Sequence, residues 1–152
     1  GTENLAAIAG FGAAAEAADA ERAEGAWERV RGLRDRLERA MSECDDRIIV
    51  FGSGVERLPN TLCIGAPGWR GETQVMALDL AGFAVSAGAA CSSGKTGASA
   101  GLAAMARSMG LDEAAAAEAI RVSIGPTTTE IEIDRFAERW TGLYDKRRAT
   151  AA

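Results

Sequence analysis

The sequence predicts a small α/β domain, α+β-like in organisation, in which a mixed or antiparallel sheet of about four strands is covered by helices. Three observations predict this fold class. Short β-rich runs alternate with segments of helical periodicity, glycine or proline marks the turns between them, and 152 residues can form one core without disulfides or metal. The expected order is helix, two strands, helix, strand, two helices, strand and helix.

The first predicted element is one long amphipathic helix that follows an alanine-rich segment. From Glu21 onward, Gly25 and Gly32 lie inside this helix, and each costs it about 1 kcal/mol relative to alanine. The apolar positions recur at helical spacing and comprise Trp27, Val30, Leu33, Leu37 and Met41. The opening residues, GTENLAAIAGFG, contain no methionine and are typical of the middle of a protein, so we expect a fragment of a longer parent.

The middle of the chain changes to the period of strands. RIIVFGS at 47–53 and LPNTLCIG at 58–65 predict two strands, bounded by glycine or proline. GETQVMALDLAG at 71–82 has apolar residues between two glycines and predicts a short helix. GFAVSAG at 82–88 predicts a third strand.

Two further helices and a strand follow. SAGLAAMARSMG at 99–110 predicts a helix that ends at Gly110, and LDEAAAAEA at 111–119 predicts another, with Asp112 at its N-cap. AIRVSIG at 119–125 predicts the fourth strand.

The last predicted helix begins within PTTTEIEIDRF. Thr129 and Glu132 have the spacing of a capping box. The stripe expected to be buried consists of Phe136, Trp140 and Leu143, and the tail KRRATAA is expected to be frayed.

Composition and charge exclude several classes of function. The formal net charge of −5 is spread over alternating acidic and basic side chains, which leaves no basic face for a phosphate backbone. No apolar run approaches the ~20 residues of a membrane span, and the N-terminus lacks the pattern of a signal peptide. We therefore expect a cytoplasmic protein that binds neither nucleic acid nor membrane.

The cysteines predict neither disulfides nor a metal site. Cys44, Cys63 and Cys91 are odd in number and far apart, which fits a reducing compartment. The sequence contains no C-x-x-C pair and no histidine, so no metal is expected.

The stretch SAGAACSSGKTG, residues 86–97, resembles the end of a phosphate-binding P-loop only superficially. A P-loop has four residues between its first glycine and the Gly-Lys pair, whereas five residues separate Gly88 from Gly94 here. The spacing therefore argues against nucleotide binding.

The same stretch places Cys91 among small residues, four positions before Lys95. A flexible segment and a nearby cation favour a reactive thiolate. Free cysteine is also one of the most buried residue types, so local sequence leaves a reactive and an inert Cys91 equally open. Cys44, on the predicted helix, and Cys63, in an apolar strand, are expected to be structural.

The run VSAGAACSSGK, residues 85–95, resembles the active-site cysteine loop of the cysteine desulfurases, which are pyridoxal-phosphate enzymes of the class V aminotransferase family. Other landmarks occur in the family's order, so the resemblance spans nearly the whole chain. They are GTEN at 1–4, LPNTL at 58–62, GETQVMALD at 71–79 and AIRVSIGPTTTEIEID at 119–134.

This resemblance implies roles for three residues. Cys91 would accept sulfur from L-cysteine as a persulfide, with release of alanine, and pass it to an acceptor protein for iron–sulfur cluster assembly or other sulfur transfer. Arg121 would grip the substrate carboxylate with its planar guanidinium, although an exposed strand face or a surface ion pair would explain this arginine equally well. Thr2 would contact the cofactor phosphate of a neighbouring subunit, which implies a homodimer.

The resemblance also implies a domain division. Residues 1–20 would be the end of the large cofactor domain or a connecting segment, residues 21–147 the C-terminal small domain of the pyridoxal-phosphate transferase fold, and residues 148–152 a tail. The family's cofactor lysine, its acidic partner and its stacking histidine lie upstream. The lysines here, Lys95 and Lys146, are not in the matching context, so this chain alone is expected to be inactive.

The segment TGASAGLAAMARSMGLD departs from the family pattern, because it is longer than usual and lacks the proline, serine and histidine typical of this region. This departure leaves the sulfur acceptor open. Two alternatives also remain: another class V enzyme, such as an aminotransferase, lyase or selenocysteine lyase, with Cys91 as a spectator, or a free-standing sulfur-carrier or binding module.

Overall fold

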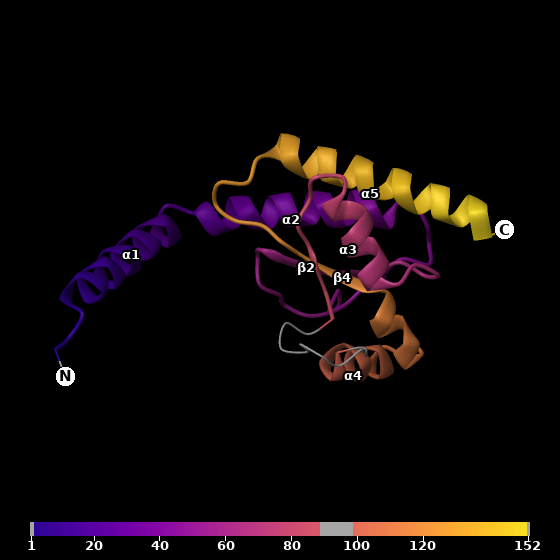
Figure 1. Ribbon diagram of the computed structural model, residues 1–152, viewed down its shortest axis with the longest axis horizontal. Coiled ribbons are helices and arrows are strands. Elements are labelled where there is room, and N and C mark those ends of the chain that lie inside the picture. Colours follow the sequence, from indigo (N-terminus) through magenta and orange to yellow (C-terminus); the bar gives the residue numbers. More distant parts are fainter. Residues whose placement is uncertain (1, 89–98, 152) are drawn as a thin grey trace.

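A computed structural model describes residues 2–88 and 99–151 of the chain (Figure 1). The elements in this part are α1 (Leu5–Ala23), α2 (Ala26–Ser42), β1 (Ile49–Val50), β2 (Thr61–Gly65), α3 (Gly71–Asp79), β3 (Ser86–Ala87), α4 (Ala100–Ser108), the 3₁₀ helix η1 (Glu113–Glu118), β4 (Ala119–Ser123) and α5 (Glu130–Ala151). The order of strands and helices agrees with the prediction, with one helix more at the N-terminus.

The strands form one four-stranded antiparallel sheet in the order β1-β2-β4-β3. This confirms the predicted fold class and settles the choice between a mixed and an antiparallel sheet. The central pair, β2 and β4, is joined along five residue pairs, from Thr61 opposite Ser123 to Gly65 opposite Ala119. The edge strands β1 and β3 are each only two residues long.

One face of the sheet carries the main hydrophobic core. Because side chains alternate along a strand, Leu62 and Ile64 of β2 point to the same face as Ile120 and Val122 of β4. These four side chains are buried against residues of α2, α3 and α5. Figure 1 shows α2 and α5 lying along one another on the same side of the sheet.

A smaller cluster covers part of the opposite face. Phe51, Ala106, Ala115 and Ala119 are buried there, and they bring α4 and η1 against the end of the sheet. The segment 111–119 was predicted as an ordinary helix, but it forms a 3₁₀ helix of six residues capped by the Asp112 carboxylate. A longer α-helix has no room here, because β4 begins at the next residue, and short connectors of this kind favour 3₁₀ turns.

The predicted long N-terminal helix is interrupted at Gly25, which adopts a left-handed conformation with φ of 78°. An L-residue rarely adopts this conformation, so glycine permits a break that the hydrophobic pattern alone does not indicate. α1 has no buried residue, and Figure 1 shows it extending away from the rest of the molecule. α2, after the break, buries Val30, Leu33, Leu37 and Met41, as predicted.

The capping box of the last helix is confirmed. The Thr129 backbone N–H donates to the Glu132 carboxylate at 2.8 Å, and the Glu132 N–H donates back to Thr129 Oγ1 at 3.3 Å. Phe136 and Trp140 are buried and Leu143 packs against the core. α5 continues to Ala151, so the tail KRRATAA, which we expected to be frayed from residue 146, is helical through Ala151.

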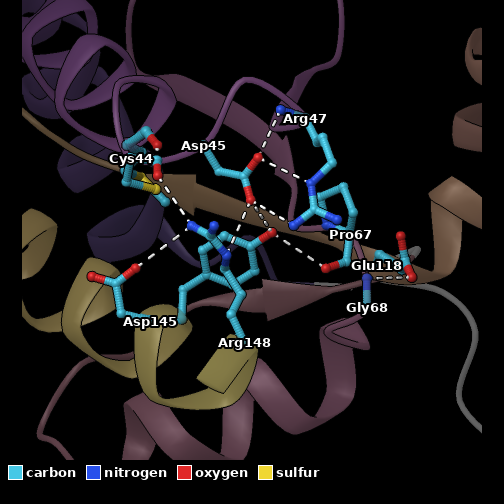
Figure 2. A network of polar contacts seen from close by, with 10 residues as sticks. Cys44, Asp45, Arg47, Pro67, Gly68, Glu118, Asp145 and Arg148 are labelled. Carbon is cyan, nitrogen blue, oxygen red and sulfur yellow. Dashed lines mark hydrogen bonds and ion pairs between the residues drawn. The ribbon is translucent and has the colours of Figure 1, made fainter. Parts of the chain in front are cut away.

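A polar network, shown in Figure 2, anchors the C-terminal half of α5. The Asp45 carboxylate accepts hydrogen bonds from Arg47 and from the Tyr144 hydroxyl, and it lies 3.4 Å from Arg148 Nε. Its side chain is only 6% exposed, and hydrogen bonds from Arg47 hold its pKa far below the ordinary range. Burial raises the pKa of Tyr144 to about 12. The network joins α5 to the turn after α2.

Within the described ranges, no helix is both long and apolar enough to cross a membrane.

Candidate active site

The candidate site lies on the face of the sheet opposite the main core. Arg121 of β4 is paired with Cys63 of β2 on one side and with Ser86 of β3 on the other. Directly opposed residues in antiparallel strands project to the same face. The three side chains therefore form one row across three strands, which we call the Arg121 row.

Arg121 points away from its apolar neighbours Ile120 and Val122, as the strand period predicted. The side chain is half-buried, and its Nε is buried without a hydrogen-bond partner among the described residues. Its one side-chain hydrogen bond to a described residue runs from Nη2 to Ser86 Oγ, at 3.4 Å.

No carboxylate in residues 2–88 or 99–151 forms an ion pair with Arg121. The surface ion pair that would have explained Arg121 without a function is therefore absent from this part. An unpaired, partly buried guanidinium is costly, and the ligand that best relieves the cost is a carboxylate or phosphate. The arrangement can bind an anion.

Cys63 occupies the other side of the Arg121 row. Burial raises the pKa of its thiol to about 11, and the positive charge of Arg121 opposes this increase without cancelling it. The thiol is therefore protonated at neutral pH and does not neutralise Arg121. This agrees with the structural role that we expected for Cys63, because the side chain also packs against the smaller hydrophobic cluster of Phe51, Ala106, Ala115 and Ala119.

Cys44, the other cysteine expected to be structural, lies two residues beyond the end of α2 rather than on the helix. Its Sγ donates to the Met41 carbonyl at 3.0 Å, and burial raises its pKa. It is remote from the Arg121 row, because it packs against the core on the other face of the sheet.

Two residues of α3 fix the strands beside the row, and sequence analysis assigned no role to either. A Cβ at Gly71 would lie 2.4 Å from the Ala119 carbonyl oxygen and 3.1 Å from the Ala87 Cβ, so only glycine allows this approach of α3 to β3 and β4. The one available sign was the glycine at the predicted helix start.

Gln74 is fully buried one turn further along α3. Its Nε2 donates to the carbonyls of Trp69 and Glu118, at 2.8 and 2.7 Å, and its Oε1 accepts from Trp140 Nε1 at 3.0 Å. These bonds tie the start of β4 to α3 and α5. The sequence gives no sign of this role, because Gln74 directly follows the polar residues Glu72 and Thr73.

Of the other two predicted site residues, only Thr2 lies within the described part of the chain. Cys91 lies within residues 89–98, outside the described residues. Thr2 is exposed and precedes α1, at the end of that helix far from the sheet (Figure 1). What the structure does place is the approach to the cysteine segment: β3 ends at Ala87, and Ser86, next to Arg121, precedes Cys91 by five positions.

The described residues do not fit pyridoxal phosphate by themselves. Lys146 is exposed on α5, in the layer that covers the opposite face of the sheet from Arg121. The chain has no histidine to stack on a pyridine ring. The groups that would hold this cofactor must come from outside the part of the chain described here. Among the described residues, no group of three His, Cys, Asp or Glu side chains could hold a metal.

Comparisons with known proteins agree over almost the full chain. The family model described as aminotransferase class-V matches residues 1–136. A cysteine desulfurase of Cereibacter sphaeroides is 42% identical over 149 residues, which is 98% of this chain and 36% of that protein. A protein named cysteine desulfurase IscS, from Anaeromyxobacter, is 40% identical over 134 residues, 88% of this chain and 31% of that protein.

A solved structure of similar fold is the NifS-like protein of Rickettsia africae. It superposes with a TM-score of 0.76 at 29% identity, over 95% of this chain and 36% of that one. The chain thus spans about a third of the length of the proteins it matches.

Proposed function

The chain belongs to the class V aminotransferase family, and from this premise we propose that it is the C-terminal part of a cysteine desulfurase that takes sulfur from L-cysteine. The observation that carries the proposal is the guanidinium of Arg121, which forms no ion pair with any described carboxylate and lies next to the strand that leads into the Cys91 segment. Relatives named cysteine desulfurase support the same activity.

Arg121 binds the carboxylate of the amino-acid substrate. A guanidinium offers parallel N–H groups that match the two oxygens of a carboxylate, which orients the substrate as well as holding it. No described carboxylate competes for this charge, and the neutral Cys63 thiol leaves it unneutralised.

Cys91 receives the sulfur. In the balanced reaction, L-cysteine and the Cys91 thiol give L-alanine and a Cys91 persulfide: the substrate C–S bond breaks, an S–S bond forms, and the carbon gains the hydrogen that sulfur loses. Pyridoxal phosphate, held by the remainder of the parent, supplies the electron sink that this bond cleavage requires. The persulfide then passes its sulfur to an acceptor protein, as in iron–sulfur cluster assembly.

The exposure of α1 supports the domain division that we propose. This helix buries none of its residues, and it exposes Leu5, Ile8 and Phe11. A helix of 19 residues that contains two glycines is only marginally stable when nothing packs against it. We therefore propose that the rest of the parent covers α1. Residues 1–20 are then the end of the large cofactor domain or a connecting segment, and the small domain begins at about residue 21. It extends beyond the predicted limit of 147, because α5 continues without a break through the predicted tail to Ala151.

The remaining assignments follow the family resemblance. Thr2 would contact the cofactor phosphate of a second subunit in a homodimer, and the expected location is the cytoplasm. The parent enzyme would be active, and this chain alone inactive, because it lacks the cofactor lysine.

The test is the mass of the Cys91 peptide from the full-length parent, kept non-reduced after incubation with pyridoxal phosphate and L-cysteine. One additional sulfur atom on this peptide, and none on the Cys44 or Cys63 peptides, is the expected result. Arg121→Lys should reduce the yield of modified peptide at low L-cysteine, since a point charge replaces a bidentate donor.

An unmodified Cys91 in a parent that binds the cofactor would overturn the proposal. The chemistry would then be that of another class V enzyme, such as an aminotransferase, lyase or selenocysteine lyase. A parent without any cofactor domain would point instead to a sulfur-carrier or binding module.

A further inference from the structure

The Ser86 hydroxyl lies beside the guanidinium of Arg121 on the neighbouring strand. The two residues are directly opposed in the β3–β4 ladder, and Arg121 Nη2 donates to Ser86 Oγ at 3.4 Å. Both side chains are half-buried. Because cross-strand partners share a face, the backbone itself keeps the hydroxyl next to the arginine.

No other described side chain holds Arg121 in this way. Cys63, on the opposite side of the row, presents a protonated thiol, which is a weak acceptor. Nε has no acceptor, and no ion pair restrains the guanidinium among residues 2–88 and 99–151. Arginine has many rotamers, so without an anchor the binding of an anion would also have to order this side chain.

We propose that Ser86 is a positioning residue, whose hydroxyl holds Nη2 of Arg121 so that the remaining guanidinium N–H groups face the substrate carboxylate. This inference rests on the proposed function, because it assigns a second residue to the same site. In this proposal β3 does more than add two residue pairs to the sheet. Through Ser86, this strand also orients Arg121, the arginine that binds the substrate carboxylate.

The experiment uses the full-length parent loaded with pyridoxal phosphate and compares two ligands by calorimetric titration. L-Alanine carries the carboxylate, and ethylamine is the same molecule without it. In Ser86→Ala the affinity for L-alanine should fall by about three- to tenfold, the value of one hydrogen bond, while the affinity for ethylamine stays unchanged. Ser86→Thr, which keeps the hydroxyl, should retain the original affinity.

Kinetics give a second readout. Ser86→Ala should raise KM for L-cysteine by a similar factor and leave kcat within about twofold, as expected for lost uniform binding. The matched control is Ser123→Ala, because Ser123 lies on the same face of β4 two residues further and is exposed. That variant should leave both affinities unchanged.

A fall in affinity for both ligands, or for neither, would overturn the role of Ser86. Ser86→Cys is the control for a folding defect, because it keeps a side chain of similar size and replaces the hydroxyl with a weak acceptor. It should weaken the binding of L-alanine as Ser86→Ala does.

Arg121→Met separates this inference from the proposed function. If that variant keeps the preference for L-alanine over ethylamine, the role of Arg121 itself fails. If it loses the preference while Ser86→Ala keeps it, only the inference about Ser86 fails.

Discussion

Strand β4 faces two different environments with consecutive residues. Ile120 and Val122 are buried in the main core, against helices that press on that face. Arg121, between them, carries a buried nitrogen that has no hydrogen-bond partner in residues 2–88 and 99–151. One side of the strand therefore contributes to the main core, while the other side carries a charge that no described carboxylate neutralises. We therefore expect mutations on the two faces to change the free energy of unfolding in opposite directions.

The largest effect is expected on the apolar face. Ile120→Ala removes a side chain that is 1% exposed, and we expect the free energy of unfolding of the chain to fall by about 2–5 kcal/mol. Urea denaturation followed by tryptophan fluorescence measures this change. Ser123→Ala on the same strand is the control and should change stability by less than about 0.5 kcal/mol. Equal losses in the two variants would contradict the contrast between the faces.

The next largest loss of stability is expected at Gln74, whose hydrogen bonds connect α3 and α5 to the start of β4. Gln74→Met keeps the volume of the side chain but leaves the Trp140 indole N–H and the carbonyls of Trp69 and Glu118 without their partner. Each buried group left unpaired costs about 1–3 kcal/mol, so we expect a loss in that range or somewhat above it in the same denaturation experiment. Unchanged stability would contradict this prediction, because it would mean that the Gln74 side chain stabilises the fold only by its packing and not by its hydrogen bonds.

A smaller effect of opposite sign is expected on the polar face. Arg121→Met replaces a partly buried charge, which no described carboxylate pairs, with an apolar side chain of similar length. We expect the free energy of unfolding to stay the same or to rise by up to about 1 kcal/mol, because removing this charge removes its desolvation cost. A loss as large as that of Ile120→Ala would show that the fold depends on the guanidinium.

The smallest effect is a pH dependence at Cys63. Its pKa of about 11 in the folded chain lies above its ordinary value of 9.0, so folding favours the protonated thiol. This contribution to stability is present below pH 9 and is lost as the pH rises through 11.

Alkylation of the folded chain by iodoacetamide, followed by the mass of the Cys63 peptide, measures the same titration. The rate should rise to half of its maximum near pH 11, and in Arg121→Met at a still higher pH, since the arginine lowers the pKa of the thiol. A titration near pH 9, in either protein, would contradict the burial of this group.

The sequence was sufficient for the alternation of elements and for the direction of Arg121, because both depend on local periodicity. It could not identify the neighbours of Arg121. Ser86 and Cys63 are 35 and 58 positions away, and only the register of the sheet places them opposite the arginine. Likewise, nothing local distinguishes Gly25, which breaks a helix, from Gly32, which lies inside one.

The left-handed Gly25 also sets the limit of the autonomous folding unit. Every core residue follows it, and α1 before it contributes none. A polypeptide shortened to begin near residue 24 would therefore lose no interior packing, and it would shed the apolar stripe of Leu5, Ile8 and Phe11 that invites self-association in water. For recombinant production of this portion by itself, the chain is best started at the left-handed Gly25.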